Sequence, residues 1–202
     1  MIKPLILDIN SGNILSLKNI ISRFSKNVSI GNNDDNILNA THIFLPGVGS
    51  YSQVMQNVKN TVNIKLLKKK LLENEVMFLG ICVGMQVLSD CGYENDKSEG
   101  LSLINGSVKK MDTKEILPHV GWNSINFNKK SKLLNQIPNK SDFYFTHSYS
   151  YHLEDSTSVI SNTNYGLSFP SIINKLNIYG TQFHPEKSQS NGIKLIKNFL
   201  EL

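Results

Sequence analysis

Apolar positions in the first half of the chain alternate between two patterns. Short continuous apolar runs recur, and each is followed by apolar residues spaced three or four positions apart. The first pattern is typical of a strand buried on both faces, and the second of an amphipathic helix. We expect strands at Pro4–Ile9, Val28–Ile30, His42–Leu45 (ended by Pro46–Gly47) and Val76–Leu79. We expect helices at Ile14–Phe24, at Tyr51–Leu72 (continuous or broken near Asn60–Thr61), one that starts from a cap at Asp34–Asp35, and one that begins with Gly84–Leu88. This alternation predicts a parallel sheet covered by helices on both faces.

The second half of the chain has shorter strand-like runs separated by Asn, Gly and Ser. These runs predict antiparallel or mixed strands added to the parallel sheet. They lie at Ser107–Met111, Ser124–Phe127, Phe143–Tyr149, Val159–Ile160 and Ser171–Ile173, before a closing strand at Ile178–Phe183 and a helix at Gly192–Leu200. No repeat or low-complexity linker interrupts the sequence, so we expect one α/β domain over residues 1–202.

The composition excludes several classes of protein. Hydrophobic residues make up 40% and charged residues 18%, which argues against intrinsic disorder. No apolar run approaches the roughly 20 residues that span a bilayer, so we expect no membrane association. The apolar stretch at Pro4–Ile9 is too short for a signal peptide, and two cysteines do not frame a secreted disulfide scaffold. We therefore expect a cytoplasmic protein.

The net charge of +5 comes from 21 Lys and Arg against 16 Asp and Glu, and Arg23 is the only arginine. Proteins that read nucleic acids rely on arginine for bidentate contacts, so we expect no nucleic-acid partner. A solvated basic surface is the favoured interpretation. A basic face that binds an acidic partner or a phosphorylated ligand is the alternative.

The sharpest chemical signal is the segment LGICVGMQ at Leu79–Gln86, where an apolar strand runs through G-x-C-x-G into a helix. This is the context of a nucleophile elbow, with Cys82 in place of serine. Small residues are needed at Gly80 and Gly84 around the strained turn, and the helix start favours a thiolate. The backbone N–H of Val83 would then point at a developing oxyanion. The competing interpretation is an ordinary buried cysteine.

The second cysteine, Cys91, lies nine positions further on, near the expected end of the same helix. It has no flanking glycine elbow and does not stand at a helix start. We therefore interpret it as structural.

A cysteine nucleophile needs a base held by a third group. His184 ends the last expected strand, and Glu186 follows two positions later across Pro185. Residues i and i+2 of an extended segment project to the same side, so Glu186 can hold the imidazole while its other nitrogen faces the thiol. A surface loop is the alternative, and a metal site lacks further ligands at suitable spacing. The remaining histidines are interpreted as structural: His42, His119, His147 and His152.

A third element is the glycine-rich segment PGVGS at Pro46–Ser50, which follows a strand. Such a turn can present backbone N–H groups at the carboxyl edge of a parallel sheet. A phosphate-binding P-loop is not favoured, because its lysine and Ser/Thr pattern is missing. An ordinary turn is the simpler alternative.

Taken together, the three elements resemble the class I, or triad, glutamine amidotransferases. The resemblance implies their flavodoxin-like three-layer α/β fold, in which helices flank a mostly parallel sheet. Within this class, the segments at Pro46–Ser50, Pro118–Asn123 (PHVGWN) and His147–Tyr149 (HSY) look like the glutaminase subunits of imidazole glycerol phosphate synthase. The resemblance covers essentially the whole chain.

The resemblance implies a catalytic triad and an oxyanion hole. Cys82 would attack the side-chain carbonyl of glutamine and form a thioester, with His184 as general base and acid, oriented by Glu186. The oxyanion would be held by the backbone N–H of Val83 and one from the segment Gly47, Val48 and Gly49. In this family that segment must reorient for full activity.

The resemblance also implies binding residues and a partner. Glutamine would be held by Gly49, Gln86, Ser148 and Tyr149. Asn13, Trp122 and Asn123 would face a (β/α)₈-barrel cyclase subunit in a heterodimer. The released ammonia would pass to that subunit, which would make imidazole glycerol phosphate and AICAR in histidine biosynthesis. No cofactor and no metal are implied.

One segment departs from the family pattern. The usual D-Y-G-x-G-N reads DINSGN at Asp8–Asn13, in a loop that would border the partner. A paralogue that supplies ammonia for surface-polysaccharide modification is therefore the main alternative. Weaker alternatives are the glutaminase of pyridoxal phosphate synthesis, a non-catalytic module on the same fold and a stand-alone cysteine hydrolase.

Overall fold

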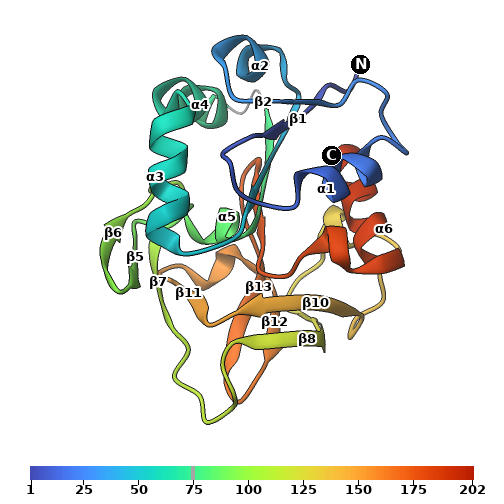
Figure 1. Cartoon of the computed structure of the whole chain (residues 1–202). Coiled ribbons are helices and arrows are strands. Elements are labelled where there is room, and N and C mark those ends of the chain that lie inside the picture. Colours follow the sequence, from blue (N-terminus) through green and yellow to red (C-terminus); the bar gives the residue numbers. More distant parts are fainter. Residues whose placement is uncertain (74–75) are drawn as a thin grey trace.

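The structure is a computed structural model that describes residues 1–73 and 76–202. A single eight-stranded sheet runs through its centre in the order β2-β1-β3-β4-β14-β13-β12-β9 (Figure 1). Its strands, in chain order, are β1 (Pro4–Leu7), β2 (Ser29–Gly31), β3 (His42–Gly47), β4 (Met77–Cys82), β9 (Asn126–Phe127), β12 (Val159–Asn164), β13 (Ser168–Lys175) and β14 (Ile178–Thr181). Pairs from β2 to β14 are parallel, and those from β14 to β9 are antiparallel. The predicted parallel core with an antiparallel addition is confirmed.

Helices cover both faces of this sheet. Figure 1 shows α3 and α4 on one side of the parallel strands and α1 and α6 on the other. The helices are α1 (Ile14–Ile21), α2 (Asp34–Asn39), α3 (Tyr51–Thr61), α4 (Ile64–Leu72), α5 (Val83–Gln86) and α6 (Gln189–Leu200). Between them lie buried apolar side chains, as where Phe199 of α6 packs edge-on against Phe44 of β3. Within the described residues, no helix is both long and apolar enough to cross a membrane.

The expected helix at Tyr51–Leu72 is broken, close to where the sequence allowed a break. α3 ends at Thr61, and Asn63 begins α4 by accepting a hydrogen bond from the backbone N–H of Leu66. A polar side chain that satisfies a free N–H at a helix start favours a new helix over continuation of the old one.

Two smaller sheets, formed by strands between Cys91 and Leu153, close over the carboxyl ends of the parallel strands. The first has the order β11-β7-β5-β6, and the second pairs β8 with β10. Their strands are β5 (Cys91–Glu94), β6 (Asp96–Glu99), β7 (Gly106–Lys110), β8 (His119–Ser124), β10 (Asp142–His147) and β11 (Tyr149–Leu153). The expected single run at Phe143–Tyr149 thus splits at Ser148, and its two parts join different sheets.

Three local predictions are wrong. The helix after Cys82 ends at Gln86, and Cys91 begins β5, in which Gly92 packs so closely on the Tyr51 ring that a Cβ would lie 2.5 Å from it. The cap of α2 is Asn33, which accepts a hydrogen bond from the N–H of Asn36.

The third error concerns the end of β3. This strand continues through Pro46 to Gly47, although the sequence predicted that Pro46 would end it. Pairing with β1 stops at Phe44, so the last residues of β3 have a neighbour on the β4 side only. A proline without an N–H is tolerated at such an edge.

Candidate active site

Cys82 stands on a strained turn between β4 and α5. Its φ is 55° and its ψ −112°, a conformation that residues with a side chain rarely adopt. A Cβ at Gly80 would lie 2.4 Å from the carbonyl oxygen of Gly84, and one at Gly84 would lie 1.9 Å from that of Leu45. Both glycines are therefore required by close backbone approach, as the elbow pattern predicts.

His184 and Glu186 form a buried pair beside Cys82. The Nδ1 of His184 donates to Oε1 of Glu186 at 2.9 Å, and the two side chains are only 3% and 2% exposed. The predicted reason for this contact is wrong: Pro185–Lys187 is a turn of 3₁₀ helix, not an extended segment. This tight turn brings the Glu186 carboxylate back to the imidazole of His184, two positions earlier in the chain.

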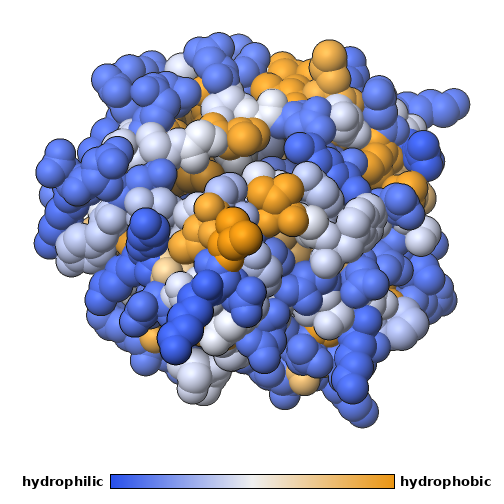
Figure 2. All heavy atoms as spheres, turned by 60° about the horizontal axis from the view of Figure 1, so that its bottom comes forward, coloured by the Kyte–Doolittle hydropathy of each residue, from blue (hydrophilic) through white to orange (hydrophobic). Residues whose placement is uncertain are grey.

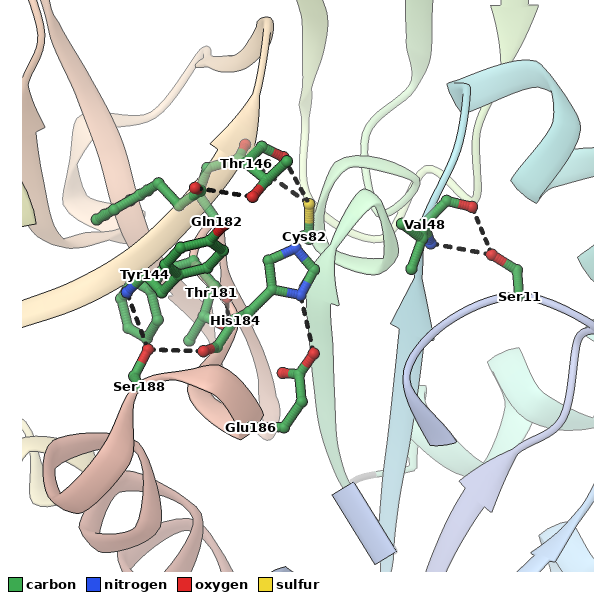
Figure 3. A network of polar contacts seen from close by, with 12 residues as sticks. Ser11, Val48, Cys82, Tyr144, Thr146, Thr181, Gln182, His184, Glu186 and Ser188 are labelled. Atoms are coloured by element: carbon green, nitrogen blue, oxygen red, sulfur yellow. Dashed lines mark hydrogen bonds and ion pairs between the residues drawn. The ribbon is translucent and has the colours of Figure 1, made fainter. Parts of the chain in front are cut away.

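The charges around His184 favour its protonated form. Burial lowers the pKa of His184, but the neighbouring Cys82 and the hydrogen bond and charge of Glu186 outweigh burial, and the pKa is raised well above its ordinary value of 6.5. In Figure 3 the imidazole lies between the Cys82 sulfur and the Glu186 carboxylate. The arrangement suits a thiolate–imidazolium pair, the reactive form of a cysteine nucleophile.

The sequence analysis missed Gln182, a fully buried residue just after β14. Its Nε2 lies 3.8 Å from the Cys82 sulfur, and its Oε1 accepts a hydrogen bond of 3.0 Å from Gln86. The sulfur also lies 3.7 Å from the backbone oxygen of Thr146. Gln182 therefore links the nucleophile to the predicted glutamine-binding residue Gln86. Its position two residues before His184 was the available signal.

A cavity of about 230 Å³ opens in front of Cys82, a volume that suits a ligand of amino-acid size. It brings together the nucleophile and most of the residues expected to hold the oxyanion and the glutamine. Its lining consists of Val48, Gly49, Cys82, Val83, Gln86, Glu94, Pro118, Thr146, His147, Ser148 and Tyr149. Glu94, which was not predicted, contributes a carboxylate that also accepts a 2.8 Å hydrogen bond from the N–H of Tyr51. Gly47 is not among these lining residues, but it pairs in register with Cys82 on the neighbouring strand.

The glycine-rich segment is held away from Cys82. Both polar backbone atoms of Val48 bind the Ser11 hydroxyl: the N–H donates to it at 2.9 Å, and the carbonyl accepts from it at 2.6 Å. Figure 3 shows this contact on the side of Val48 remote from the nucleophile. The expected oxyanion donor Val48 is thus engaged elsewhere in this conformation. Gly49 next to it has φ +110° and open space where a Cβ would stand, so the segment has room to turn.

The three residues expected to face a partner lie outside the cavity. Asn13 precedes α1, in a loop that packs on Pro46, and Trp122 of β8 is 48% exposed. Asn123 lies on the opposite, inward side of β8, where its amide binds His119 and the carbonyl of Asn164. Only Trp122 of the two β8 residues is therefore directly open to a partner.

Residues 1–73 and 76–202 contain no group of three or more His, Cys, Asp or Glu side chains that could hold a metal ion. Cys82 and Cys91 are both free. The chemistry available at the site is therefore that of the thiol, the His184–Glu186 pair and the surrounding backbone dipoles.

Comparisons with known proteins agree with this geometry. The family described as glutamine amidotransferase class-I matches residues 5–202. Imidazole glycerol phosphate synthase subunit HisH of Methanocaldococcus jannaschii is 43% identical over 198 residues, covering 98% of both chains. Subunit HisH 1 of Methanococcus maripaludis is 40% identical over 199 residues, also with 98% of both chains covered.

Solved structures share the fold at low sequence identity. A crystal structure of a glutamine amidotransferase has a TM-score of 0.75 at 13% identity and covers 98% of this chain and 97% of its own. The structure of PurLQS from Thermotoga maritima has a TM-score of 0.75 at 14% identity, with 99% and 98% covered. The match over nearly the whole length, together with the Cys82 elbow and its His184–Glu186 pair, places the chain in the class I glutamine amidotransferase family.

Proposed function

We propose that the chain is the glutaminase subunit of an imidazole glycerol phosphate synthase. The observation that carries the proposal is one cavity that joins a strained cysteine, backed by a buried His–Glu pair, to the segments at 46–50, 118–123 and 147–149. Relatives about 40% identical over their full length bear the name of this subunit. The subunit hydrolyses glutamine and delivers the ammonia for histidine biosynthesis.

In the proposed reaction, the Cys82 sulfur attacks the side-chain carbonyl carbon of glutamine. The proton held on His184 passes to the leaving nitrogen, ammonia departs and a γ-glutamyl thioester remains. His184 then takes a proton from water, the hydroxide attacks the thioester, and glutamate leaves as the thiol is restored. Glu186 holds the ring orientation in both steps, because its Oε1 accepts a hydrogen bond from the Nδ1–H of His184.

Recognition of glutamine is assigned to the far wall of the cavity. Ser148 and Tyr149 offer backbone groups, and Gln86 lines the same cavity with its amide bonded to the Tyr149 carbonyl. Glu94 supplies a negative charge in the lining, and we assign it to the α-ammonium group of the substrate. Gly49 also lines the cavity and is assigned to glutamine binding.

We propose that the oxyanion hole is completed only when the glycine-rich segment turns. The N–H of Val83 at the start of α5 is one donor, and a backbone N–H of the Gly47–Gly49 segment is the other. The Ser11 contact opposes this turn, because it occupies both backbone groups of Val48. Release of that contact would therefore switch on the glutaminase.

The partner in this proposal is the cyclase subunit, and its docking face includes β8 and the loop at Asp8–Asn13. β8 and β10 run along the bottom of the view in Figure 1. Figure 2 brings this side of the molecule forward and shows a central group of apolar side chains among polar ones. Val120 and Trp122 of β8 are 55% and 48% exposed. Ammonia would pass across this face to the cyclase. A cytoplasmic location belongs to the same proposal, since free cysteines suit a reducing compartment.

The test is the rate of glutamate release from glutamine under three conditions: the chain alone, with the cyclase subunit of the same organism, and with that subunit plus its nucleotide substrate. We expect very low activity alone and strong stimulation in the third condition. Trp122→Ala should weaken the pairing of the two subunits. Its expected loss is about 2 kcal/mol, or roughly 30-fold in Kd, for a central aromatic residue of an interface.

Absence of stimulation, with Cys82 still labelled by a glutamine-like alkylating agent, would contradict the assignment to histidine biosynthesis but leave the amidotransferase chemistry standing. The same assay with a sugar-modifying synthase as partner would then test the polysaccharide alternative.

A further inference from the structure

Two buried histidines outside the triad are hydrogen-bonded to each other, and one of them, His147, lines the cavity. His119 of β8 and His147 of β10 face each other in the antiparallel register, and Nδ1 of His119 lies 3.3 Å from Nε2 of His147. They are 3% and 6% exposed. The thioester chemistry uses neither of them, so their burial needs another reason.

Asn123, His119, His147 and the Tyr149 carbonyl form a chain of hydrogen bonds, and the bonds at its two ends fix which atoms donate and which accept. Nδ1 of His147 lies 2.9 Å from the carbonyl oxygen of Tyr149, so it must carry the proton, and Nε2 is left to accept. Nδ1 of His119 must then donate to His147, which leaves Nε2 of His119 to accept from the Asn123 amide at 3.3 Å.

The Asn123 amide has only one orientation that satisfies its neighbours. Its Oδ1 accepts from the N–H of Ser124 at 2.8 Å, and its Nδ2 donates to the carbonyl of Asn164 at 3.0 Å. The amide nitrogen therefore faces His119, as the direction worked out from the Tyr149 end requires. Every link from Asn123 to Tyr149 is a donor meeting an acceptor.

The surroundings keep both rings in place and uncharged. The His119 ring is stacked on Tyr165 with centroids 3.9 Å apart and on Phe145 at 5.0 Å, while Phe169 meets the His147 ring edge-on. Burial lowers the pKa of His119, and burial lowers that of His147 to about 3. An uncharged ring donates through one nitrogen and accepts through the other, which is what a directional chain needs.

The Tyr149 carbonyl is where the chain meets the catalytic site. The same oxygen accepts a second hydrogen bond, 3.0 Å from Nε2 of Gln86, and Gln86 in turn contacts Gln182 beside the Cys82 sulfur. Tyr149 and Gln86 both line the cavity. A shift of His147 would therefore move the groups assigned to hold glutamine.

We propose that His119 and His147 are positioning residues that couple β8 to the glutamine pocket, so that a partner docked on β8 sets the Tyr149 carbonyl and Gln86. The proposal rests on the proposed function. Alternate residues of β8 face opposite ways: Val120 and Trp122 point outward and are about half exposed, whereas His119 and Asn123 point inward to the chain of hydrogen bonds. A partner that displaces Val120 and Trp122 would therefore also displace His119 and Asn123.

A matched pair of variants separates a positioning role from mere packing. His147→Asn places an amide N–H where Nδ1 stood and keeps the hydrogen bond to Tyr149, whereas His147→Gln places its amide near the Nε2 position and loses that bond. Two reagents report on Cys82 in the free chain: iodoacetamide, which needs only the thiolate, and a diazoketone analogue of glutamine, which also needs the pocket. His152→Asn, on the exposed part of β11, is the control.

We expect His147→Gln to slow alkylation by the glutamine analogue about tenfold, the effect of one buried hydrogen bond, with the iodoacetamide rate unchanged. His147→Asn should stay within about twofold of the wild type, by the same reasoning. Equal losses in both variants, or equal slowing with both reagents, would overturn the positioning role. This arm uses no partner, so it is interpretable even if the assignment to imidazole glycerol phosphate synthase fails.

The second arm tests the coupling to β8. His119→Asn keeps an N–H toward His147 but loses the acceptor for Asn123. We expect normal alkylation of the free chain and a reduced stimulation of glutaminase activity by the cyclase subunit with its nucleotide substrate. Full stimulation of this variant would overturn the coupling, provided the wild type is stimulated in the same assay.

Discussion

The two sides of the active site around Cys82, the strong wall with His184 and Glu186 and the weak wall with Val48, are held in very different ways. On one wall, His184 and Glu186 are almost fully buried and bonded to each other, and the backbone N–H of His184 is tied to the carbonyl of Tyr144. On the other wall, Val48 is 49% exposed, and its polar backbone atoms are held by the single hydroxyl of Ser11.

Under the proposed function, this difference would mean that the nucleophile is preformed in the free chain, whereas the oxyanion hole is completed only later. A buried pair costs several kcal/mol to disturb, whereas each of the two exposed hydrogen bonds between Ser11 and Val48 contributes only about 0.5–1.5 kcal/mol. A partner can therefore act on the weak wall without disturbing the strong one. Glutamine would then be hydrolysed only where the ammonia can be used.

The largest expected effect comes from removing the nucleophile of the strong wall. Cys82→Ala should lower glutamine hydrolysis by at least roughly 10⁴-fold, as in other enzymes with a nucleophilic triad. The assay is glutamate release, and the ammonia-dependent reaction of the partner should persist. Cys91→Ser, in the other free cysteine, is the control and should retain activity. Glutamine-dependent synthesis by the Cys82→Ala complex would disprove the assignment.

The next largest effect is expected from Glu186, the third residue of the triad. Glu186→Gln should slow glutamine hydrolysis by roughly 10²- to 10⁴-fold, because the amide no longer holds the protonated imidazole. Glu186 helps to raise the pKa of His184, so the variant should lower that pKa. Titration of the His184 ring by NMR measures the change. An unchanged titration would mean that Cys82 alone sets the charge of His184.

The pH dependence of the unfolding free energy should report on the buried histidines His147 and His119. Burial lowers the pKa of His147 to about 3, against an ordinary value of 6.5. Between these values the unfolded chain binds the proton and the folded chain does not, so stability is lost as the pH falls below 6.5. The expected slope is about 1.4 kcal/mol in unfolding free energy per pH unit for this group. Urea unfolding at pH 7, 6 and 5 measures it.

The matched variant for this effect is His147→Asn, which cannot titrate in that range. Its unfolding free energy should depend less steeply on pH, by the slope of one proton. His119, whose pKa burial also lowers, should leave a residual slope. Identical slopes in the two proteins would show that His147 is protonated in the folded state.

The smallest expected effect tests the weak wall. Ser11→Ala removes the hydroxyl that makes both hydrogen bonds to Val48, and the activity of the free chain should rise by about two- to tenfold, because water replaces part of these exposed hydrogen bonds. The stimulated rate with the partner should change little. Ser16→Ala, on α1, serves as the control. A lower free-chain rate after Ser11→Ala would mean that Ser11 supports the active conformation instead.

Short-range patterns predicted much of this molecule. The apolar runs located the parallel strands, and Gly80 and Gly84 marked the turn at Cys82, because backbone crowding at a strand-to-helix turn is a local property. The predicted length of the helix after Cys82 and the predicted end of β3 were wrong. Each depends on a distant neighbour: Tyr51 packs on Gly92, and β1 stops pairing with β3 at Phe44. The geometry between His184 and Glu186 was also wrong, although their proximity was expected.

The sequence by itself determined the chemistry: a cysteine on a glycine-flanked elbow, a histidine with a nearby carboxylate and a glycine-rich segment after a strand. Only the tertiary structure decided how these are linked. Gln182 reaches Cys82 across 100 positions, His147 reaches His119 across 28, and Ser11 reaches Val48 across 37. The physical reason is that a side-chain hydrogen bond has a range of about 3 Å. Its partner is therefore chosen by the topology that brings distant segments together, which no local pattern records.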